Sequence, residues 1–296
     1  MPAPVVAAPA PFKAALGAPD AARAIAAGFR LADPGVEVRE VPVADGGEGT
    51  ADALVAALGG RRRGVASEDP LGRPIDASIG ELPDRVAVVE LAQAAGYGLL
   101  DEGERDPERA STRGVGGLVR AALDMGAQRI VVAVGGSATN DAALGVAVAL
   151  GAVARDGDGV ELHGRGGDLA RVARLDLTGL DPRLAQVEID VATDVDNPFH
   201  GPDGAAHVFG PQKGAGPAAV RRLDAGLERF AGVLREVVGR DVSGLAGAGA
   251  AGGAAGGLVA MLGARIVPGA DLVLDAVDLD GALEGAGPVS YTHLRA

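Results

Sequence analysis

Three polar segments, two of them glycine-rich and each directly after a predicted strand, constrain the fold of this chain more than any other feature. They are residues 45–50 (DGGEGT), 135–141 (GGSATND) and 193–197 (TDVDN). The runs before them are β-branched or alternate in polarity, as strands do, and they cover 36–43, 129–134 and 187–192. In open α/β sheets, ligands bind beyond the carboxyl ends of the strands. The three segments therefore predict a single ligand-binding site at the edge of the sheet where their strands end.

The rest of the chain also alternates strand and helix patterns, which is typical of an α/β protein. An apolar run at 5–8 precedes a helical pattern at 19–30, and a second clear helix is predicted at 217–238. Residues 64–82 contain the turn sequence DPLGRP and predict an antiparallel hairpin instead. A chain of 296 residues suggests two domains, at about 150 residues each.

The composition narrows the choice of ligand. The net charge is −13 and the pI about 4.7, so nucleic acid and anionic membranes are poor partners. An anionic small molecule would need local backbone N–H groups, a helix N-terminus or a bound cation. The chain has no cysteine, which excludes thiol nucleophiles and thiolate metal sites. We recognise no signal peptide and no apolar stretch of about 18 residues, so we expect a cytoplasmic protein without a membrane span.

Familiar nucleotide-binding and hydrolase motifs are absent from the sequence. It contains no G-x-x-x-x-G-K-[ST], no G-x-S-x-G and no H-E-x-x-H, which excludes a P-loop and the corresponding hydrolase sites. Residues 247–253 (GAGAAGG) come nearest to a dinucleotide fingerprint, but they do not follow a clear strand. We therefore predict that this segment forms a close-packed helix contact, and a dinucleotide-dependent oxidoreductase is disfavoured.

The glycine-rich segments carry side chains suited to an anion and a divalent cation. Gly135 and Gly136 let the backbone approach an anion closely, and the hydroxyl and amide groups after them can donate hydrogen bonds. That segment suits a phosphate or a carboxylate equally. Asp45 and Glu48 could bind Mg²⁺ or accept a proton from a substrate hydroxyl, and Asp194 offers a similar carboxylate. Each segment alone is an ordinary turn, but their joint occurrence favours a site.

A series of longer motifs, in one order along nearly the whole chain, resembles the glycerate kinase family of the bacterial glycerate 2-kinase type. The motifs are DGGEGTADAL (45–54), DPLGRP (69–74), ELAQAAGYGLL (90–100), VAVGGSATNDAALG (132–145), ATDVDNP (192–198), VFGPQKGA (208–215) and PGADLVLDAVDLD (268–280). The resemblance implies ATP-dependent phosphorylation of D-glycerate to 2-phosphoglycerate. It also implies Mg²⁺ as the cofactor that accompanies ATP, and no P-loop.

The resemblance further implies roles for particular residues. The catalytic candidates are Asp45, Asp194 and Lys213, and the two aspartates are also the candidate Mg²⁺ ligands. The candidates for binding substrate or phosphate are Lys13, Gly46, Gly47, Glu48, Gly135, Gly136, Ser137, Thr139, Asn140, Asp141 and Asn197. From the residues alone, Lys13 and Lys213 could instead be exposed, solvated lysines. The sequence gives no expectation for the oligomeric state.

The predicted fold is α/β with two discontinuous domains. Residues 1–60 and 255–296 are expected to form a Rossmann-like or flavodoxin-like parallel sheet, incomplete at the C-terminus. Residues 61–254 are expected to form a second α/β domain with a mixed sheet, which carries the 135–141 segment. The site is expected in the cleft between the two domains.

Two departures from the family pattern bear on activity. The family resembles A-P-D-S-F-K-G-S-L after the first strand, whereas residues 8–16 read APAPFKAAL, so Ala10 stands in the place of an acid. Residues 290–296 (SYTHLRA) stand where a T-G-E-G loop is expected, and we expect that the chain is truncated there and that the tail is foreign to the family. The alternative function is therefore a catalytically impaired α/β protein that binds a nucleotide or an organic acid.

Overall fold

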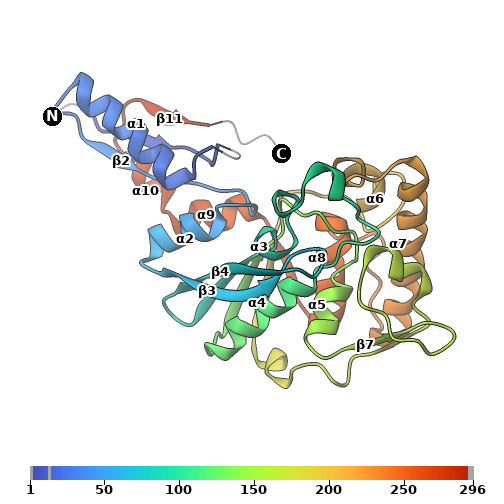
Figure 1. The fold of residues 1–296 in the computed structure, drawn as a ribbon. Helices are drawn as coiled ribbons and strands as arrows, with labels where there is room; N and C mark the ends of the chain where they lie inside the picture. The colour runs from blue at the N-terminus through green and yellow to red at the C-terminus, as the bar shows by residue number, and fades with distance from the viewer. Residues whose placement is uncertain (1–2, 13–14, 293–296) are drawn as a thin grey trace.

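Segments from the two ends of the chain form one small parallel sheet. The computed structural model describes residues 3–12 and 15–292. The sheet has the strand order β11-β1-β2, with β1 at Val5–Ala8, β2 at Val38–Glu40 and β11 at Val289–Tyr291. Val6 pairs with Val289 on one side and with Arg39 on the other. Figure 1 shows the red β11 beside the blue N-terminal elements.

Four helices accompany the small sheet. They are α1 (Ala18–Ala32), α2 (Thr50–Leu58), α9 (Gly269–Ala276) and α10 (Leu279–Leu283). Helix α1 buries a face of alanines, and its Ala26 packs with Val5 and Val38 of the sheet. Helices α2 and α9 also touch the larger sheet described next, so they lie between the two sheets.

The larger sheet is mixed, as the sequence predicts. Its order is β10-β9-β6-β5-β4-β3, and its strands are β3 (Arg61–Glu68), β4 (Pro74–Leu82), β5 (Val86–Glu90), β6 (Arg129–Ala133), β9 (Glu188–Ala192) and β10 (Arg265–Val267). Strands β3 and β4 form the predicted antiparallel hairpin, β4 is antiparallel to β5, and the remaining pairs are parallel. The carboxyl ends of β5, β6, β9 and β10 therefore meet at one edge.

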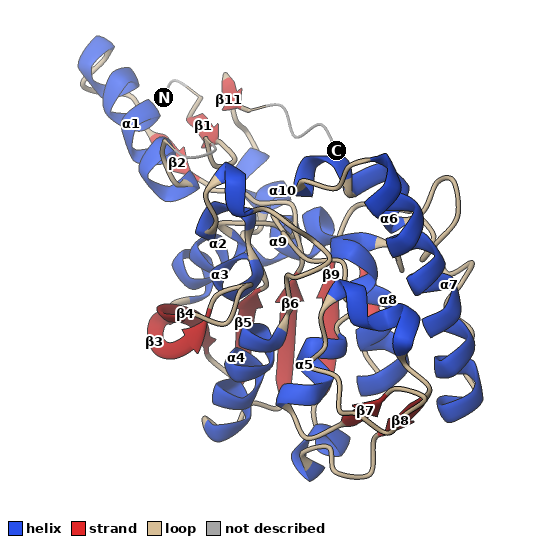
Figure 2. Ribbon diagram, turned by 45° about the vertical axis from the view of Figure 1, so that its right-hand side comes forward, coloured by secondary structure: helices blue, strands red, loops and turns tan. Residues whose placement is uncertain are grey.

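Both faces of this sheet are covered, which follows from the alternation of side chains along a strand. On β6, Ile130 and Val132 face a core that includes Leu118 and Phe230, while Val131 faces Leu54 of α2 on the opposite side. The other helices are α3 (Ala92–Ala95), α4 (Arg113–Asp124), α5 (Leu144–Ala149), α6 (Ala205–Phe209), α7 (Pro217–Val238) and α8 (Ala250–Leu262). Figure 2 shows α4, α5 and α8 in front of the sheet.

Short elements complete the chain. The 3-10 helices are η1 (Tyr97–Leu99), η2 (Glu102–Glu104), η3 (Gly166–Arg171), η4 (Pro182–Gln186) and η5 (Pro211–Lys213). A two-stranded sheet pairs β7 (Val153–Arg155) with β8 (Arg174–Asp176). Within the described ranges, no helix is long and apolar enough to cross a membrane.

The structure confirms the predicted α/β class and the helix at 217–238. The helix after GGSATND begins only at Leu144, because Ala142 and Ala143 adopt left-handed φ angles of 51° and 56°. Strand β10 pairs with β9, so residues 265–267 belong to the larger sheet. The division into domains at residues 60 and 255 stays a prediction.

Candidate active site

The three polar segments that follow predicted strands meet at the carboxyl edge of the larger sheet. The N–H of Gly135 donates to the carbonyl of Gly46 over 3.2 Å. A Cβ atom on Gly135 would lie 2.5 Å from the Cα of Gly47, and one on Gly46 would lie 2.9 Å from the carbonyl oxygen of Ala192. Only glycine permits backbones to approach so closely. The convergence of the segments that follow β2, β6 and β9 is therefore confirmed.

One part of this edge carries three carboxylates, Asp45, Glu48 and Asp194, which we call the acidic corner. Asp45 and Glu48 are exposed. Asp194 is half-buried and accepts hydrogen bonds from the N–H groups of Gly269 (2.7 Å) and Ala270 (3.0 Å), at the start of α9. Burial raises the pKa of Asp194, and the nearby Asp45 adds to the rise, although the two backbone donors oppose it.

The acidic corner fits a divalent cation held partly by other ligands. Asp45 and Asp194 are close enough for repulsion, and neither forms an ion pair with a lysine or arginine in the described part of the chain. No group of three or more His, Cys, Asp or Glu side chains in residues 3–12 and 15–292 is arranged to hold a metal. Mg²⁺ commonly takes one or two carboxylates and completes its shell with phosphate and water oxygens. These two aspartates suit that mode of binding.

The second part of the edge surrounds a buried lysine. Lys213, at the end of η5, is 1% exposed. Its Nζ donates to the Oγ of Ser137 (2.8 Å) and to the carbonyl oxygen of Thr139 (2.6 Å). Burial lowers the pKa of Lys213 to about 7, and the nearby Asp141 opposes the shift. We call Lys213 together with Ser137, Thr139, Asn140 and Asp141 the lysine corner.

Several polar atoms of the lysine corner are buried without a partner. Asp141 accepts hydrogen bonds from the N–H and the hydroxyl of Thr112, and burial raises its pKa to about 6. Its Oδ1 has no hydrogen-bond partner, and the same is true of the Thr139 hydroxyl and of both amide atoms of Asn140. Buried polar atoms are normally satisfied, so a cluster of exceptions points to a bound ligand or ordered water.

The glycine-rich segment 247–253 packs against the lysine corner from behind. A Cβ on Gly252 would lie 2.1 Å from the carbonyl oxygen of Thr139, and one on Gly257 would lie 1.8 Å from that of Ala142. The N–H of Ala142 donates to the carbonyl of Gly252 over 3.1 Å. The interpretation of this segment as a close-packed helix contact is therefore confirmed.

The structure does not bring every candidate into these corners. The side chain of Asn197 donates to the carbonyl oxygen of Asp203, within its own loop. Lys13 lies outside the described residues. The N–H of Ala10 donates to the hydroxyl of Thr292 over 2.6 Å, and the adjacent Pro11 lies where a Cβ on Gly49 would be only 2.8 Å away. Position 10 is thus near the DGGEGT segment.

Two residues of the edge escaped the sequence interpretation. Glu90 ends β5 and is 2% exposed, and its carboxylate accepts the N–H of Ala51 over 2.9 Å, which fixes the start of α2. Burial raises the pKa of Glu90. The position of Glu90 at the end of a predicted strand could have identified it as a candidate from the sequence. Thr112 directly precedes α4, and its hydroxyl donates to the carboxylate of Asp141 over 2.8 Å, a contact that no local pattern indicates.

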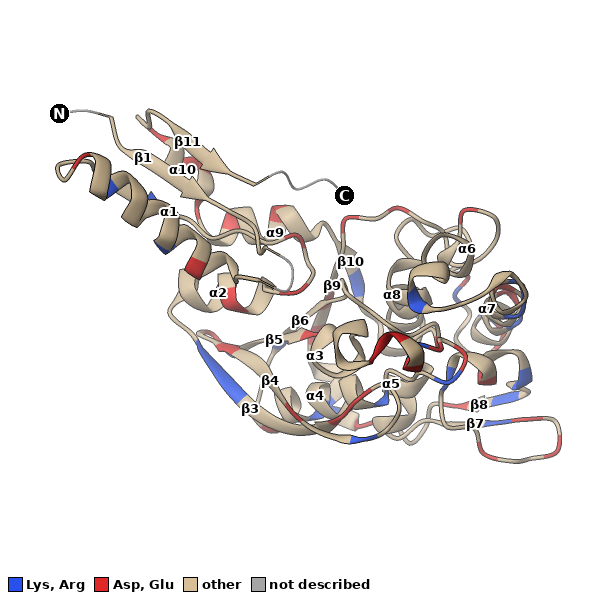
Figure 3. Cartoon of the chain, turned by 45° about the horizontal axis from the view of Figure 1, so that its top comes forward, with Lys and Arg blue, Asp and Glu red and all other residues tan. Residues whose placement is uncertain are grey.

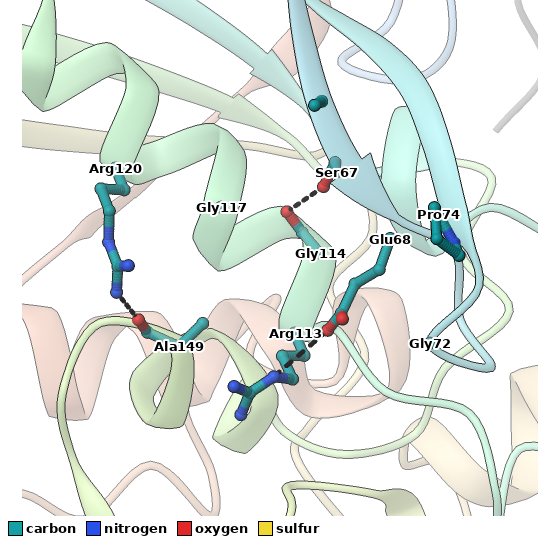
Figure 4. A pocket seen from close by; sticks show the side chains of 10 residues that line it. Ser67, Glu68, Gly72, Pro74, Arg113, Gly114, Gly117, Arg120 and Ala149 are labelled. Atoms are coloured by element: carbon teal, nitrogen blue, oxygen red, sulfur yellow. Dashed lines mark hydrogen bonds and ion pairs between the residues drawn. The ribbon is translucent and has the colours of Figure 1, made fainter.

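A pocket of about 360 Å³ beside α4 contains none of the candidate residues (Figure 4). Its arginines already have partners. Arg113 pairs with Glu68 over 3.3 Å, and Arg120 donates to the carbonyl of Ala149. The arginine run on β3 (Figure 3) is likewise occupied, since Arg61 donates twice to Glu81. Arg62 on β3 also forms ion pairs, with Asp52 and Glu90, each over 3.6 Å.

The fold and the edge together define a class: an α/β protein without a P-loop, with acidic and lysine-bearing corners at the carboxyl ends of its strands. The sequence profile described as "Glycerate kinase family" matches residues 5–290. The chain belongs to the glycerate kinase family.

Individual relatives agree with this assignment. The chain is 45% identical over 293 residues to a protein named glycerate kinase from Halalkalibacterium halodurans, covering 96% of this chain and 77% of that one. It is 43% identical to one named glycerate 2-kinase from Escherichia coli, covering 93% and 73%. A crystal structure titled as a putative glycerate kinase 2 from Salmonella typhimurium LT2 is 42% identical, with a TM-score of 0.87 and coverage of 98% and 78%.

Proposed function

We propose that the chain transfers the γ-phosphoryl group of Mg-ATP to D-glycerate and produces 2-phosphoglycerate. Membership of the glycerate kinase family and the name of the Escherichia coli relative support this substrate and product. The single observation that carries the proposal is the backbone contact of Gly47 with Gly135, which joins the acidic corner to the lysine corner. Phosphoryl transfer needs such a pairing, because it depends on positioning and on neutralising charge. The proposed location is the cytoplasm.

In the proposed mechanism, the acidic corner orients the attacking hydroxyl. A hydroxyl oxygen of the acid forms a bond to the γ-phosphorus while the bond from that phosphorus to the bridging oxygen of ADP breaks. The proton of the hydroxyl passes to Asp45 or Asp194. Mg²⁺ bound by the two aspartates would supply charge neutralisation for the phosphate oxygens.

The lysine corner would hold an anionic group of a substrate. Because Lys213 donates to the oxygen of Ser137, the hydroxyl proton of Ser137 is left to donate elsewhere. Gly136 carries no side chain, so an anion can approach its backbone closely. Hydrogen bonds that are already oriented before the substrate arrives need no reorganisation when charge moves during transfer.

A coupled assay of ADP release tests the proposal. Wild-type protein should turn over D-glycerate with Mg-ATP, and ³¹P NMR should identify 2-phosphoglycerate as the product. Formation of 3-phosphoglycerate would show that the 3-hydroxyl of glycerate, and not the 2-hydroxyl, accepts the phosphoryl group. No turnover would reject the kinase assignment.

Ala10 motivates a second candidate, a protein that binds these ligands without catalysis. That candidate predicts a ligand-dependent rise of Tm without ADP formation. In that case Ala10→Asp, which restores a carboxylate near the DGGEGT segment, should produce activity.

A further inference from the structure

Arg105 lies beside the lysine corner, although no motif marked it. A Cβ on Gly214, the residue after Lys213, would lie 2.3 Å from the carbonyl oxygen of Arg105. The guanidinium stacks over the ring of Tyr97, 5.5 Å from its centroid. Tyr97 is in turn tied to the GGSATND segment, because its N–H donates to the carbonyl of Gly136 over 3.1 Å. These contacts tie Arg105 to the two segments that carry Lys213 and Ser137.

The side chain of Arg105 has no anionic partner among the described residues. Its Nε atom is buried without a hydrogen bond. Glu104 binds Arg73 over 2.7 Å, Glu108 binds Arg222 over 2.7 Å, and the adjacent Asp106 accepts the N–H of Glu108 over 2.9 Å. A half-buried guanidinium needs a counter-charge, because burying an unpaired charge is costly. A negatively charged ligand group would supply that counter-charge.

The charges of the two corners decide which ligand group belongs there. Asp45, Glu48 and Asp194 would repel a free carboxylate, and a triphosphate with its Mg²⁺ suits them better. A guanidinium can donate two parallel hydrogen bonds to the two oxygens of a carboxylate.

We propose that Arg105 binds the carboxylate of the acid substrate, with Tyr97 holding the guanidinium in place. This inference rests on the proposed function. In this scheme, Arg105 selects hydroxy acids over uncharged polyols, because only the acids carry a carboxylate. Binding of the carboxylate also directs the hydroxyl of the acid toward the acidic corner. Arg105 is a binding residue in this scheme, and Tyr97 is a positioning residue.

Steady-state kinetics of Arg105→Gln, with Arg109→Gln as the matched control, test the inference. Arg109 lies four residues further along the same segment, is exposed and has no side-chain partner in the described structure. We expect Arg105→Gln to raise KM for D-glycerate by about 10- to 100-fold, the range for one charge-assisted hydrogen-bonded pair. KM for ATP should stay within about twofold of wild type for both variants. Arg105→Lys should recover part of the loss, and Arg109→Gln should behave as wild type.

A rise in KM for ATP alone would overturn the inference, because it would assign Arg105 to the nucleotide phosphates. Unchanged values of both constants, or equal rises of both, would also overturn it. Tyr97→Leu should reproduce the KM change in weaker form, while Tyr97→Phe, which keeps the ring, should not.

A binding measurement separates a folding defect from a binding defect. D-glycerate without ATP should raise the Tm of wild type and of Arg109→Gln, but not that of Arg105→Gln, whose unliganded Tm should stay near that of wild type. A Tm rise in Arg105→Gln equal to that of wild type would refute the proposal. Wild-type protein that neither turns over nor binds D-glycerate would refute the proposed function and the inference with it, whereas an active wild type with an unaffected Arg105→Gln would refute the inference alone.

Discussion

The acidic corner and the lysine corner are neighbours, yet they handle charge in opposite ways. Asp45 and Glu48 are exposed, so water stabilises their charges and a cation can reach them. Lys213 and Asp141 are buried, and each has a pKa displaced toward its neutral form. The comparison shows that an anion site in a protein of net charge −13 depends on local structure, since the overall charge opposes it.

The packing around the two corners differs as well. The acidic corner lies where α9 begins, and α2 and α9 contribute small apolar side chains to a core between the two sheets. The lysine corner is surrounded by backbone that comes very close, with Ala142, Ala143 and Ala251 all at left-handed φ angles. Non-glycine residues in this region cost energy and tend to occur at functional sites. The backbone of the lysine corner is thus more strained than that of the acidic corner.

The largest effect is expected in the acidic corner. Asp45→Asn and Asp194→Asn should each lower kcat by about 10³-fold, because they remove the proton acceptor or a metal ligand. Asp196→Asn is the matched control, since Asp196 is exposed in the same loop as Asp194. Measurements of kcat at saturating Mg²⁺ and ATP would check this, and kcat of Asp45→Asn within threefold of the control would contradict the assigned role.

The next effect is expected in the lysine corner. Lys213→Met keeps the length of the side chain but removes its charge and both hydrogen bonds, and it should lower kcat/KM by about 10²-fold. Lys213→Arg should not restore activity, because a fully buried site has no room for the larger guanidinium. Circular dichroism should confirm that both variants fold. An active, folded Lys213→Met would show that the buried lysine serves only the structure.

A smaller effect is expected from a substitution that pushes the acidic corner away from the lysine corner. Gly135→Ala places a methyl group against the Cα of Gly47 and should cost about 1–3 kcal/mol of the free energy of unfolding, with roughly tenfold lower kcat. Gly232→Ala on α7 meets nothing within 4 Å and should leave activity unchanged while stabilising the helix slightly. Urea unfolding with parallel kinetics would measure both. Equal activity of the two variants would mean that the spacing of the corners is unimportant.

The smallest effect is a pH dependence of stability. The unfolded chain holds the Lys213 proton up to a pKa of 10.5, whereas the folded chain releases it at about 7, so between these values the unfolded state binds more protons and stability rises with pH. The raised pKa of Asp141 acts in a lower window, where stability is lost as pH rises from 3.8 through about 6. Between pH 7.5 and 9, wild type should therefore gain up to about 1.4 kcal/mol per pH unit relative to Lys213→Met. Parallel slopes in the two proteins would contradict the lowered pKa.

Local patterns in the sequence determined the α/β class, the hairpin at 64–82, the long helix at 217–238 and the three strand ends that carry polar turns. These features depend on hydrophobic periodicity and turn chemistry, which act over a few residues. The resemblance added the family. The roles of the individual candidate residues stay predictions until the variants above are measured.

Contacts between distant segments were decided only by the tertiary structure. The alignment of parallel strands brings Lys213 to Ser137, 76 residues away, and Thr112 to Asp141, 29 residues away. Whether a lysine is solvated or buried depends on what packs around it, and no pattern near Lys213 or Arg105 encodes those neighbours. The sequence by itself therefore predicted polar functional residues at the ends of strands. The packing of distant segments decided which charged side chains are buried, which are exposed to solvent and which lack an ion-pair partner in the described part of the chain.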